Sequence, residues 1–292
     1  MSIDRLQEKI RRTKNPSVID LTVDNTMVPE CVLSRCPGRM EAYLQYAQEL
    51  MEALRGHVPA LRFQFSAFAV YGAEGLEALR TVLKRAQKMN YYVLLDAPEA
   101  LSAQRAEINA ELLLGEELGL SFDGVLLSAY IGSDGMKPYA KKMTKAGKSL
   151  FVVIRTPNKS AQELQDLLTG SRLVHIAMAD IVNNLGASSP GRSGFNMIGC
   201  AAAATSADSL KTLRNKYKNV FLFVDGYDYS SANAKICSNA FDSYGHGAIV
   251  CAGTGVTAAW SEPDLCQDDY LQHVLEAAAR MKKNLTKYVS IL

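Results

Sequence analysis

Two charged residues stand in apolar, strand-like stretches of the sequence. Asp96 ends the run YYVLLDA, and Arg62 lies inside ALRFQF. A carboxylate that ends a buried strand either lines a ligand site or caps the following helix. An arginine between apolar neighbours points into such a site, reaches solvent or pairs with a carboxylate, and Asp96 is a plausible partner. These residues predict either a polar site or a structural ion pair, and both remain open.

The stretch VVIRTPNKSAQELQDL adds polar candidates after another apolar run. Thr156 and Asn158 have groups that can hydrogen-bond a ligand. Ser160 and Glu163 have the S-x-x-E spacing of a capping box, in which each side chain bonds a backbone N–H at the start of a helix. We favour the structural interpretation for this segment, with Thr156 and Asn158 as secondary ligand contacts.

Glycines and hydroxyls gather in the last two apolar segments, VDGYDYSSANAK and AIVCAGTGVTAA. Gly253 and Gly255 flank Thr254, and Ser230 and Ser231 open a helical pattern. Backbone N–H groups of such loops bind phosphate in many α/β barrels. Two glycines are also the ordinary signature of a tight turn, so the phosphate interpretation is weak. Other motifs are missing: the four histidines have no metal-ligand spacing, and no nucleotide-binding glycine loop appears. We predict no metal site and no cofactor.

Eight short β-rich runs must position these residues. They alternate with amphipathic segments, and each has the length of a parallel strand buried on both faces. The expected strands are 18–23, 60–65, 91–97, 124–129, 149–156, 196–202, 220–226 and 248–253. The expected helices are 39–54, 75–88, 103–118, 161–168, 173–185, 206–217, 232–244 and 267–289.

This alternation predicts an α/β fold, a closed (β/α)8 TIM barrel forming a single domain over residues 1–292. Residues 1–16 are expected to form an N-terminal helical extension, and residues 264–292 to contain a C-terminal helix. Ligands of such barrels bind at the carboxyl ends of the strands. Those ends are 23–24, 63–64, 96–98, 128–130, 155–158, 199–202, 225–228 and 251–254.

Composition limits the class of protein. The chain has 292 residues, 48% hydrophobic and 21% charged, with a net charge of +2. These values exclude a disordered chain, and the charge predicts no nucleic-acid partner. The N-terminus lacks a signal-peptide core and no apolar run is long enough for a membrane span. We expect a cytoplasmic protein with no membrane partner, whose six cysteines are reduced.

The order of motifs resembles the longer, bacterial type of orotidine 5′-monophosphate decarboxylase. FDGVLLSAYIGSDGMKPY and FVVIRTPNKSAQELQDL carry the most specific similarity. IDLTVD, ALRFQFSAFAVYG, MIGCAAAATSADSLKTLR, FVDGYDYSSA and GAIVCAGTGV carry moderate similarity. Together they span about residues 17–260. The resemblance implies a barrel, a homodimer, and a site for a pyrimidine ribonucleotide whose phosphate lies at the seventh and eighth loops.

The family's chemistry uses a Lys-Asp-Lys-x-x-Asp network, in which a lysine delivers a proton to the carbon that loses carbon dioxide. By this resemblance, Arg62 stands at the first lysine position and Asp96 keeps the first aspartate. Pro98 replaces the proton-donating lysine, and Leu101 replaces the aspartate that would enter the partner's site. Arginine is a poor proton donor at neutral pH, and proline carries no side-chain proton at all.

The resemblance also places the ligand-binding positions. Thr254 stands where the family has a phosphate-clamping arginine, and Ser230 where it has a glutamine. Gly226 and Tyr227 are retained. The family's opening aspartate matches Asp20 or Asp24, and Tyr130 follows the fourth strand in the most specific motif. The ligand-binding candidates are therefore Asp20, Asp24, Tyr130, Thr156, Asn158, Gly226, Tyr227, Ser230, Gly253 and Thr254, with Asp96 and Arg62 as the catalytic candidates.

Four hypotheses follow. The first is a divergent barrel that no longer decarboxylates orotidylate and binds a small polar or phosphorylated ligand at the strand ends. The second is a carbon–carbon lyase of the same superfamily, metal-independent, with Asp96 as general acid or base and Arg62 as the group that stabilises an anion. The third is a non-catalytic, dimeric structural or regulatory protein. The fourth is retained orotidylate decarboxylation by a rearranged site.

Overall fold

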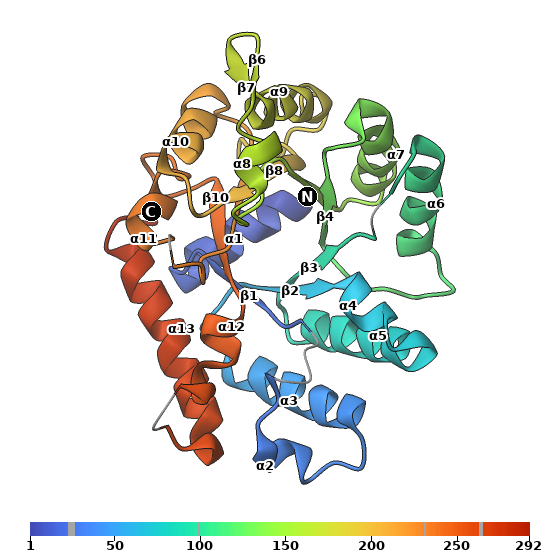
Figure 1. Ribbon diagram of the computed structural model, residues 1–292, viewed down its shortest axis with the longest axis vertical. Coiled ribbons are helices and arrows are strands. Elements are labelled where there is room, and N and C mark those ends of the chain that lie inside the picture. The colour runs from blue at the N-terminus through green and yellow to red at the C-terminus, as the bar shows by residue number, and fades with distance from the viewer. Residues whose placement is uncertain (23–26, 99, 231, 263–264) are drawn as a thin grey trace.

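The computed structural model describes residues 1–22, 27–98, 100–230, 232–262 and 265–292. Eight parallel strands close into a barrel in the order β1-β10-β9-β8-β5-β4-β3-β2 (Figure 1). The TIM barrel expected from the alternation of strands and helices is confirmed. The barrel strands are β1 (Ser17–Asp20), β2 (Ala60–Gln64), β3 (Tyr92–Asp96), β4 (Gly124–Ser128), β5 (Ser149–Val153), β8 (Ile198–Ala203), β9 (Leu222–Asp225) and β10 (Ala248–Ala252).

Helices surround the barrel on the outside (Figure 1). Their apolar faces pack on the strands, as in α5, where Leu79, Val82 and Leu83 are buried. The longer helices are α1 (Ser2–Thr13), α3 (Arg39–Ala53), α5 (Gly72–Lys88), α6 (Ala103–Leu114), α7 (Gly132–Lys145), α9 (Val174–Gly186), α10 (Ala207–Lys216) and α13 (Tyr270–Thr286). The shorter ones are α2 (Glu30–Leu33), α4 (Phe65–Ala69), α8 (Ala161–Leu164), α11 (Ala234–Ser238) and α12 (Thr254–Thr257).

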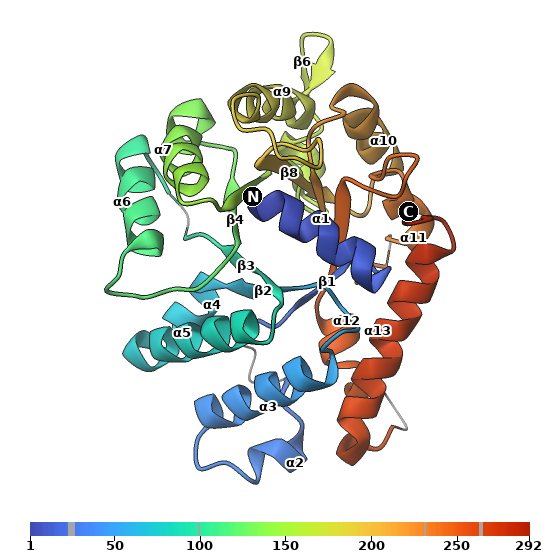
Figure 2. The same cartoon turned by 180° about the vertical axis from the view of Figure 1, so that it is seen from behind.

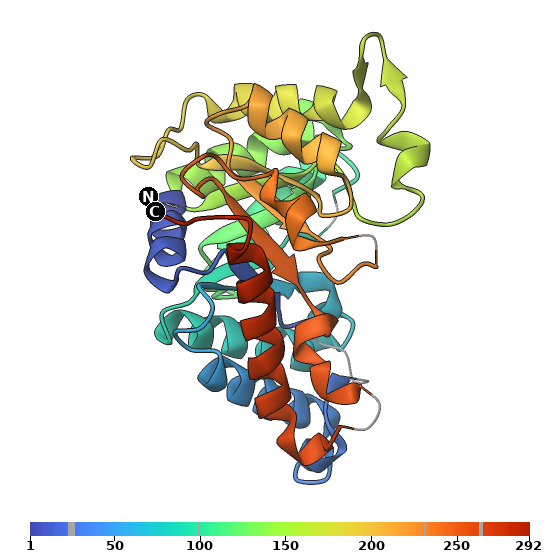
Figure 3. The same cartoon turned by 90° about the vertical axis from the view of Figure 1, so that its left-hand side faces the viewer.

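Helix α1 lies across the amino-terminal end of the barrel, on the side away from α8 and α12 (Figures 2 and 3). Ile3, Leu6 and Ile10 recur every three or four residues and are fully buried. This spacing puts all three on one face of the helix, which therefore seals the bottom of the barrel. The opposite end, where the strands terminate, remains the place for a ligand site.

Strand register places the polar residues at one level of this open end. Asp20 on β1 is opposite Arg62 on β2, and Gln64 is opposite Asp96 on β3. On the other side of the barrel, Ala203 of β8 is opposite Asp225, the last residue of β9. Because parallel strands end at the same edge, these side chains converge on the barrel mouth.

Several expected elements differ in the structure. The expected helix 161–168 ends at Leu164, and a hairpin of β6 (Leu168–Thr169) and β7 (Arg172–Leu173) follows. The expected helix 232–244 is shorter in the structure and ends at Ser238. In the turn that follows, the Asp242 carboxylate accepts hydrogen bonds from the backbone N–H groups of Tyr244 and His246. Helix α7 was not expected, and Pro138 in its interior weakens the helical signal.

The capping box predicted at Ser160 is wrong. Ser160 is the N-cap residue of α8, but its side chain makes no capping hydrogen bond. The backbone N–H of Glu163 instead donates to the Ser160 carbonyl oxygen, as in a simple turn. Within the described residues, no helix is both long and apolar enough to cross a bilayer.

Candidate ligand site at the barrel mouth

Arg62 lies at the centre of the mouth, and its guanidinium holds several carboxylates. Its Nε donates to Asp96 Oδ1 at 3.1 Å and its Nη2 donates to Asp96 Oδ2 at 2.8 Å. Its Nη1 donates to Asp225 Oδ1 at 2.9 Å. The guanidinium also lies 5.7 Å from the centre of the Phe223 ring and beside the Cys251 thiol. The two alternatives for Arg62 and Asp96 are therefore not exclusive, because they pair and also line the mouth.

Asp20 forms the second layer of this network. Its carboxylate lies 3.7 Å from Arg62 Nε and accepts hydrogen bonds from Gln64 Nε2, at 2.8 Å, and from the Thr22 hydroxyl. Only 11% of the side chains of Arg62 and Asp20 is exposed, against 28% for Asp96 and Asp225. Three carboxylates thus surround one guanidinium, which leaves an excess of negative charge when all are ionised.

Burial and this excess charge change the proton affinity of Asp96. Desolvation raises the pKa of Asp96 to about 6, because the attraction of Arg62 does not fully offset it and Asp20 and Asp225 repel the ionised form. For Arg62, desolvation disfavours the charge, but Asp225 and Asp96 outweigh it and raise the pKa of the guanidinium. Arg62 therefore stays charged, and Asp96 is the group that exchanges a proton near neutral pH.

A fourth carboxylate, that of Asp228, occupies the glycine loop at the end of β10. It accepts hydrogen bonds from the backbone N–H groups of Gly253 and Gly255. A Cβ atom on Gly255 would lie 2.4 Å from Asp228 Oδ1, so a side chain at this position would displace the Asp228 carboxylate. The backbone donors that the sequence suggested for phosphate are thus engaged by a carboxylate of the chain itself.

The remaining predicted residues are scattered. Thr156 and Asn158 bond each other at 2.6 Å, and Gln165 bonds both the backbone and the hydroxyl of Thr156. Tyr130 donates to the Ile154 carbonyl oxygen at 2.9 Å. Ser230 and Thr254 are exposed at the rim, and Gly253 donates to Asp228 as described above. Asp24 lies outside the described residues.

Gly226 and Tyr227 follow Asp225 directly after the end of β9. Gly226 has a φ of 81°, and an added Cβ atom would lie 2.5 Å from Pro157. Its backbone N–H donates to Asp225 Oδ1 at 2.9 Å, which fixes the carboxylate that Arg62 binds. Tyr227 lines a separate cavity with Asn284 and Tyr288 of the C-terminal segment. Gly226 therefore supports the Arg62 network, whereas the ring of Tyr227 does not join it.

Curated orotidine 5′-phosphate decarboxylases are similar to this chain over nearly its whole length. Orotidine 5′-phosphate decarboxylase of Clostridium acetobutylicum is 27% identical over 288 residues, which cover 98% of this chain and 99% of the relative. The enzyme of that name from Petrotoga mobilis is 23% identical, with 98% of each chain covered. The chain is therefore a divergent relative of curated orotidine 5′-phosphate decarboxylases. No model of a protein family matches it.

Solved structures of such decarboxylases share the barrel. The Leishmania donovani OMP decarboxylase aligns with a TM-score of 0.71 and 22% identity, covering 97% of this chain and 99% of that one. The Plasmodium berghei enzyme aligns with a TM-score of 0.75 and 15% identity, covering 97% and 98%. At these identities the comparison establishes the fold of this divergent decarboxylase relative.

The three positions that depart from the family motif have distinct surroundings in this decarboxylase relative. Pro98 is half-buried beyond the end of β3, and its carbonyl oxygen accepts a hydrogen bond from Asn109 at 3.2 Å. Leu101 is 77% exposed. Within the described residues, Asp20, Asp96 and Asp225 form ion pairs with Arg62 and with no lysine.

Sequence reasoning missed three residues of the mouth, namely Gln64, Asp225 and Asp228. Each lies in a segment that was expected to be a strand end, and each is polar beside an apolar run. That signal is clearer for Gln64 than for Asp225 and Asp228, because VDGYD also has the composition of a turn. Within the described residues, no group of three or more acidic, histidine or cysteine side chains is placed to hold a metal ion.

A second polar cluster lies outside the barrel and was also missed. His175 Nδ1 is 3.2 Å from Asp166 Oδ1, and its Nε2 is 2.9 Å from the Ser209 hydroxyl. Both His175 and Ser209 are buried, and His175 Nδ1 also contacts the Gln165 carbonyl oxygen at 2.8 Å. Arg155 binds Asp166 through two hydrogen bonds. This cluster joins the β5–α8 loop to α9 and α10, which is a structural role.

Proposed function

We propose that this chain is a barrel of the orotidine 5′-phosphate decarboxylase family that does not decarboxylate orotidylate and binds a small polar ligand at its mouth. The observation that carries this proposal is the pairing of Arg62 with both Asp96 and Asp225. In the family resemblance, Arg62 occupies a lysine position and Pro98 the position of the lysine that delivers the proton. A charged guanidinium held by two carboxylates does not release a proton at neutral pH.

The size of the expected loss supports this proposal. General acid catalysis contributes about 10²–10⁴-fold to a rate. The exposed Leu101 also lacks the charge that the family places at its position, and Thr254 lacks the guanidinium that would bind phosphate. Three such departures in one site act on different steps, binding and proton transfer, so a single compensating side chain does not replace them.

The charges of the mouth favour a ligand without a phosphate. Asp20, Asp96 and Asp225 outnumber Arg62, so a phosphate dianion placed there meets net repulsion. The Asp228 carboxylate already accepts from the Gly253 and Gly255 N–H groups, which are donors of the type that bind phosphate in other barrels. We therefore propose a neutral or cationic polar ligand, whose donors hydrogen-bond Asp96, Asp225 or Asp228.

Isothermal titration calorimetry with uridine and uridine 5′-monophosphate tests this proposal. These two probes differ in one phosphate group, so their affinities report the preference of the mouth directly. We expect the monophosphate to bind no more tightly than the nucleoside, and Asp228→Asn to improve monophosphate binding relative to uridine. Monophosphate binding that is about 100-fold tighter than uridine binding would show a working phosphate site and overturn the proposal.

One observation favours a second candidate function, a lyase of the same superfamily that uses different chemistry. The pKa of Asp96 is raised to about 6, which suits a general acid or base near neutral pH. Arg62 would then stabilise an anion formed on the substrate. If a substrate is found, Asp96→Asn should reduce turnover by about 10²–10⁴-fold. Unchanged turnover in that variant would exclude this role.

The homodimer expected from the resemblance remains a proposal, as does the non-catalytic structural or regulatory role. Analytical ultracentrifugation of the purified chain distinguishes a homodimer from a monomeric binding protein. A dimer with no ligand response would favour the structural role, whereas a monomer would exclude it.

A further inference from the structure

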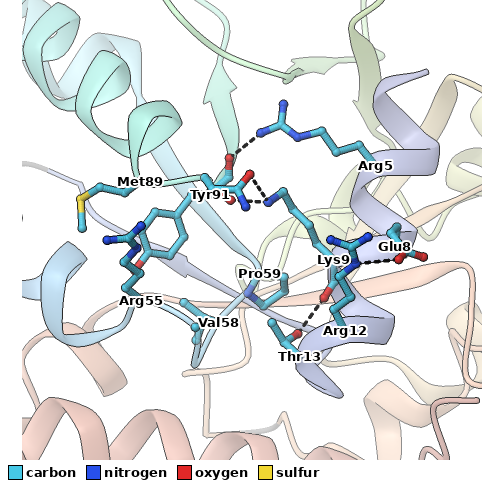
Figure 4. Close-up of a pocket in the computed structure, with 12 residues that line it drawn as sticks. Arg5, Glu8, Lys9, Arg12, Thr13, Arg55, Val58, Pro59, Met89 and Tyr91 are labelled. Carbon is cyan, nitrogen blue, oxygen red and sulfur yellow. Dashed lines mark hydrogen bonds and ion pairs between the residues drawn. The ribbon is translucent and has the colours of Figure 1, made fainter.

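A second candidate site lies at the opposite end of the barrel, beneath helix α1. A cavity of about 450 Å³ opens between α1, the β3 entry and the turn before β2. Figure 4 shows Lys9 and Arg12 reaching from α1 on one side, with Arg55 on the other side near the Tyr91 ring. Small-molecule sites in proteins commonly have volumes of this order. None of these residues belongs to the candidate ligand site at the barrel mouth, where the carboxyl ends of the strands lie.

Positive charge dominates this cavity. Its lining has four cationic side chains, Arg5, Lys9, Arg12 and Arg55, and one carboxylate, Glu8. Arg5 pairs with Asp123, and Arg12 Nε donates to Glu8 Oε1 at 2.7 Å. The other two cations lack such compensation.

Lys9 and Arg55 are the uncompensated cations. The Lys9 ammonium donates to the carbonyl oxygen and, at 3.0 Å, to the amide oxygen of Asn90, which are neutral acceptors. Within the described residues, neither Lys9 nor Arg55 has a carboxylate within ion-pair distance. Desolvation, together with the nearby Arg5, lowers the pKa of Lys9 to about 8. A bound anion would pair with these cations and would raise the pKa of Lys9 again, because it would supply the missing negative charge.

The remaining lining is suited to the organic part of a ligand. Val58 and Tyr91 are almost fully buried and form an apolar floor together with Pro59 and Met89. The guanidinium of Arg55 provides two parallel donors and the ammonium of Lys9 a point charge, so a phosphate group between the two sides of the cavity has a cation on each side. We propose that this cavity binds a small organic phosphate, with Lys9 and Arg55 holding the phosphate group.

Pyrophosphate serves as the probe, because it carries the phosphate groups that Lys9 and Arg55 are proposed to bind. We expect 1:1 binding by calorimetry, weakened at least about tenfold in the Lys9→Gln/Arg55→Gln double variant. The matched control, Lys84→Gln/Lys88→Gln, removes the same charge from another basic surface cavity and should leave the affinity unchanged. Arg55→Gln alone tests the site with little risk to folding, because the Arg55 side chain makes no hydrogen bond within the described residues.

A footprint locates the bound probe. Acetylation of Lys9, measured by mass spectrometry, should slow in the presence of pyrophosphate, whereas acetylation of Lys84 should not. No saturable binding up to about 10 mM, or equal weakening in both double variants, would overturn the proposal. So would binding without protection of Lys9. None of these outcomes bears on the mouth, so this inference and the proposed function fail or succeed independently.

Discussion

The Arg62 guanidinium binds both carboxylate oxygens of Asp96, at 3.1 and 2.8 Å. Two parallel N–H···O bonds of this kind fix the orientation of both groups. The third guanidinium nitrogen binds Asp225 from the far side of the mouth, at 2.9 Å. Arg62 therefore crosslinks β2 to β3 and β9 as a fixed cation.

Removing this cation should destabilise the fold. Arg62→Met leaves Asp20, Asp96 and Asp225 together without a counter-charge, and we expect a loss of about 3–5 kcal/mol in the free energy of unfolding. Arg62→Lys should retain part of this stability, because it keeps the charge but loses the paired geometry. Urea unfolding followed by circular dichroism measures both.

Arg80→Met is the matched control for this series. Arg80 pairs with Glu77 on the exposed surface of α5, and removing it should leave the unfolding midpoint unchanged. An Arg62→Met protein as stable as the unmodified chain would contradict the account of the mouth.

The raised pKa of Asp96 predicts a pH-dependent stability. Folded Asp96 takes up a proton at about pH 6, above its value of 3.8 in the unfolded chain. Between these pH values the folded state binds more protons, so this group's contribution to stability falls as pH rises from about 4 to above 6. Asp96→Asn removes the charge, and should stabilise the protein by up to about 3 kcal/mol at pH 8 and hardly at all at pH 4.

Paired urea titrations across that pH range check this prediction. A constant difference between the two proteins at every pH would show that Asp96 has an ordinary pKa in the folded state. Destabilisation by Asp96→Asn at pH 8 would show instead that attraction to Arg62 outweighs burial.

Gly226 should tolerate no side chain. Its φ of 81° disfavours other residues, and an added Cβ atom would lie 2.5 Å from Pro157. We expect Gly226→Ala to reduce the free energy of unfolding by about 2–4 kcal/mol. Gly72 also has a positive φ, of 65°, but nothing lies within 4 Å of its Cβ position. Gly72→Ala should therefore cost only about 1 kcal/mol, and equal losses would show that the contact with Pro157 is unimportant.

Much of the barrel could be predicted from the sequence because each buried strand is a short, continuous apolar run. Asp96 and Arg62 were selected for the same reason, as charged residues inside or ending such runs. Asp225 and Asp228 were harder to select, since VDGYD also has the composition of a turn. Their role depends on strands that meet only when the barrel closes, which is a property of tertiary structure.

Helix ends and loops carried less information in the sequence. The turn after α11 is held by the Asp242 carboxylate, which binds the backbone N–H groups of Tyr244 and His246, and an aspartate in that stretch does not by itself predict a turn. The contact of Asp228 with the glycine N–H groups is longer in range still, because 25 residues separate Asp228 from Gly253. No spacing rule within one segment reports such a contact.

Decarboxylation of orotidine 5′-monophosphate by the purified chain, followed by the loss of substrate absorbance, tests the central claim most directly. The account predicts no turnover above background at a high protein concentration, with no recovery in Arg62→Lys, because Pro98 still lacks a proton to donate. Turnover by the unmodified chain that disappears in Asp96→Asn would contradict the account and establish an active decarboxylase with a rearranged site.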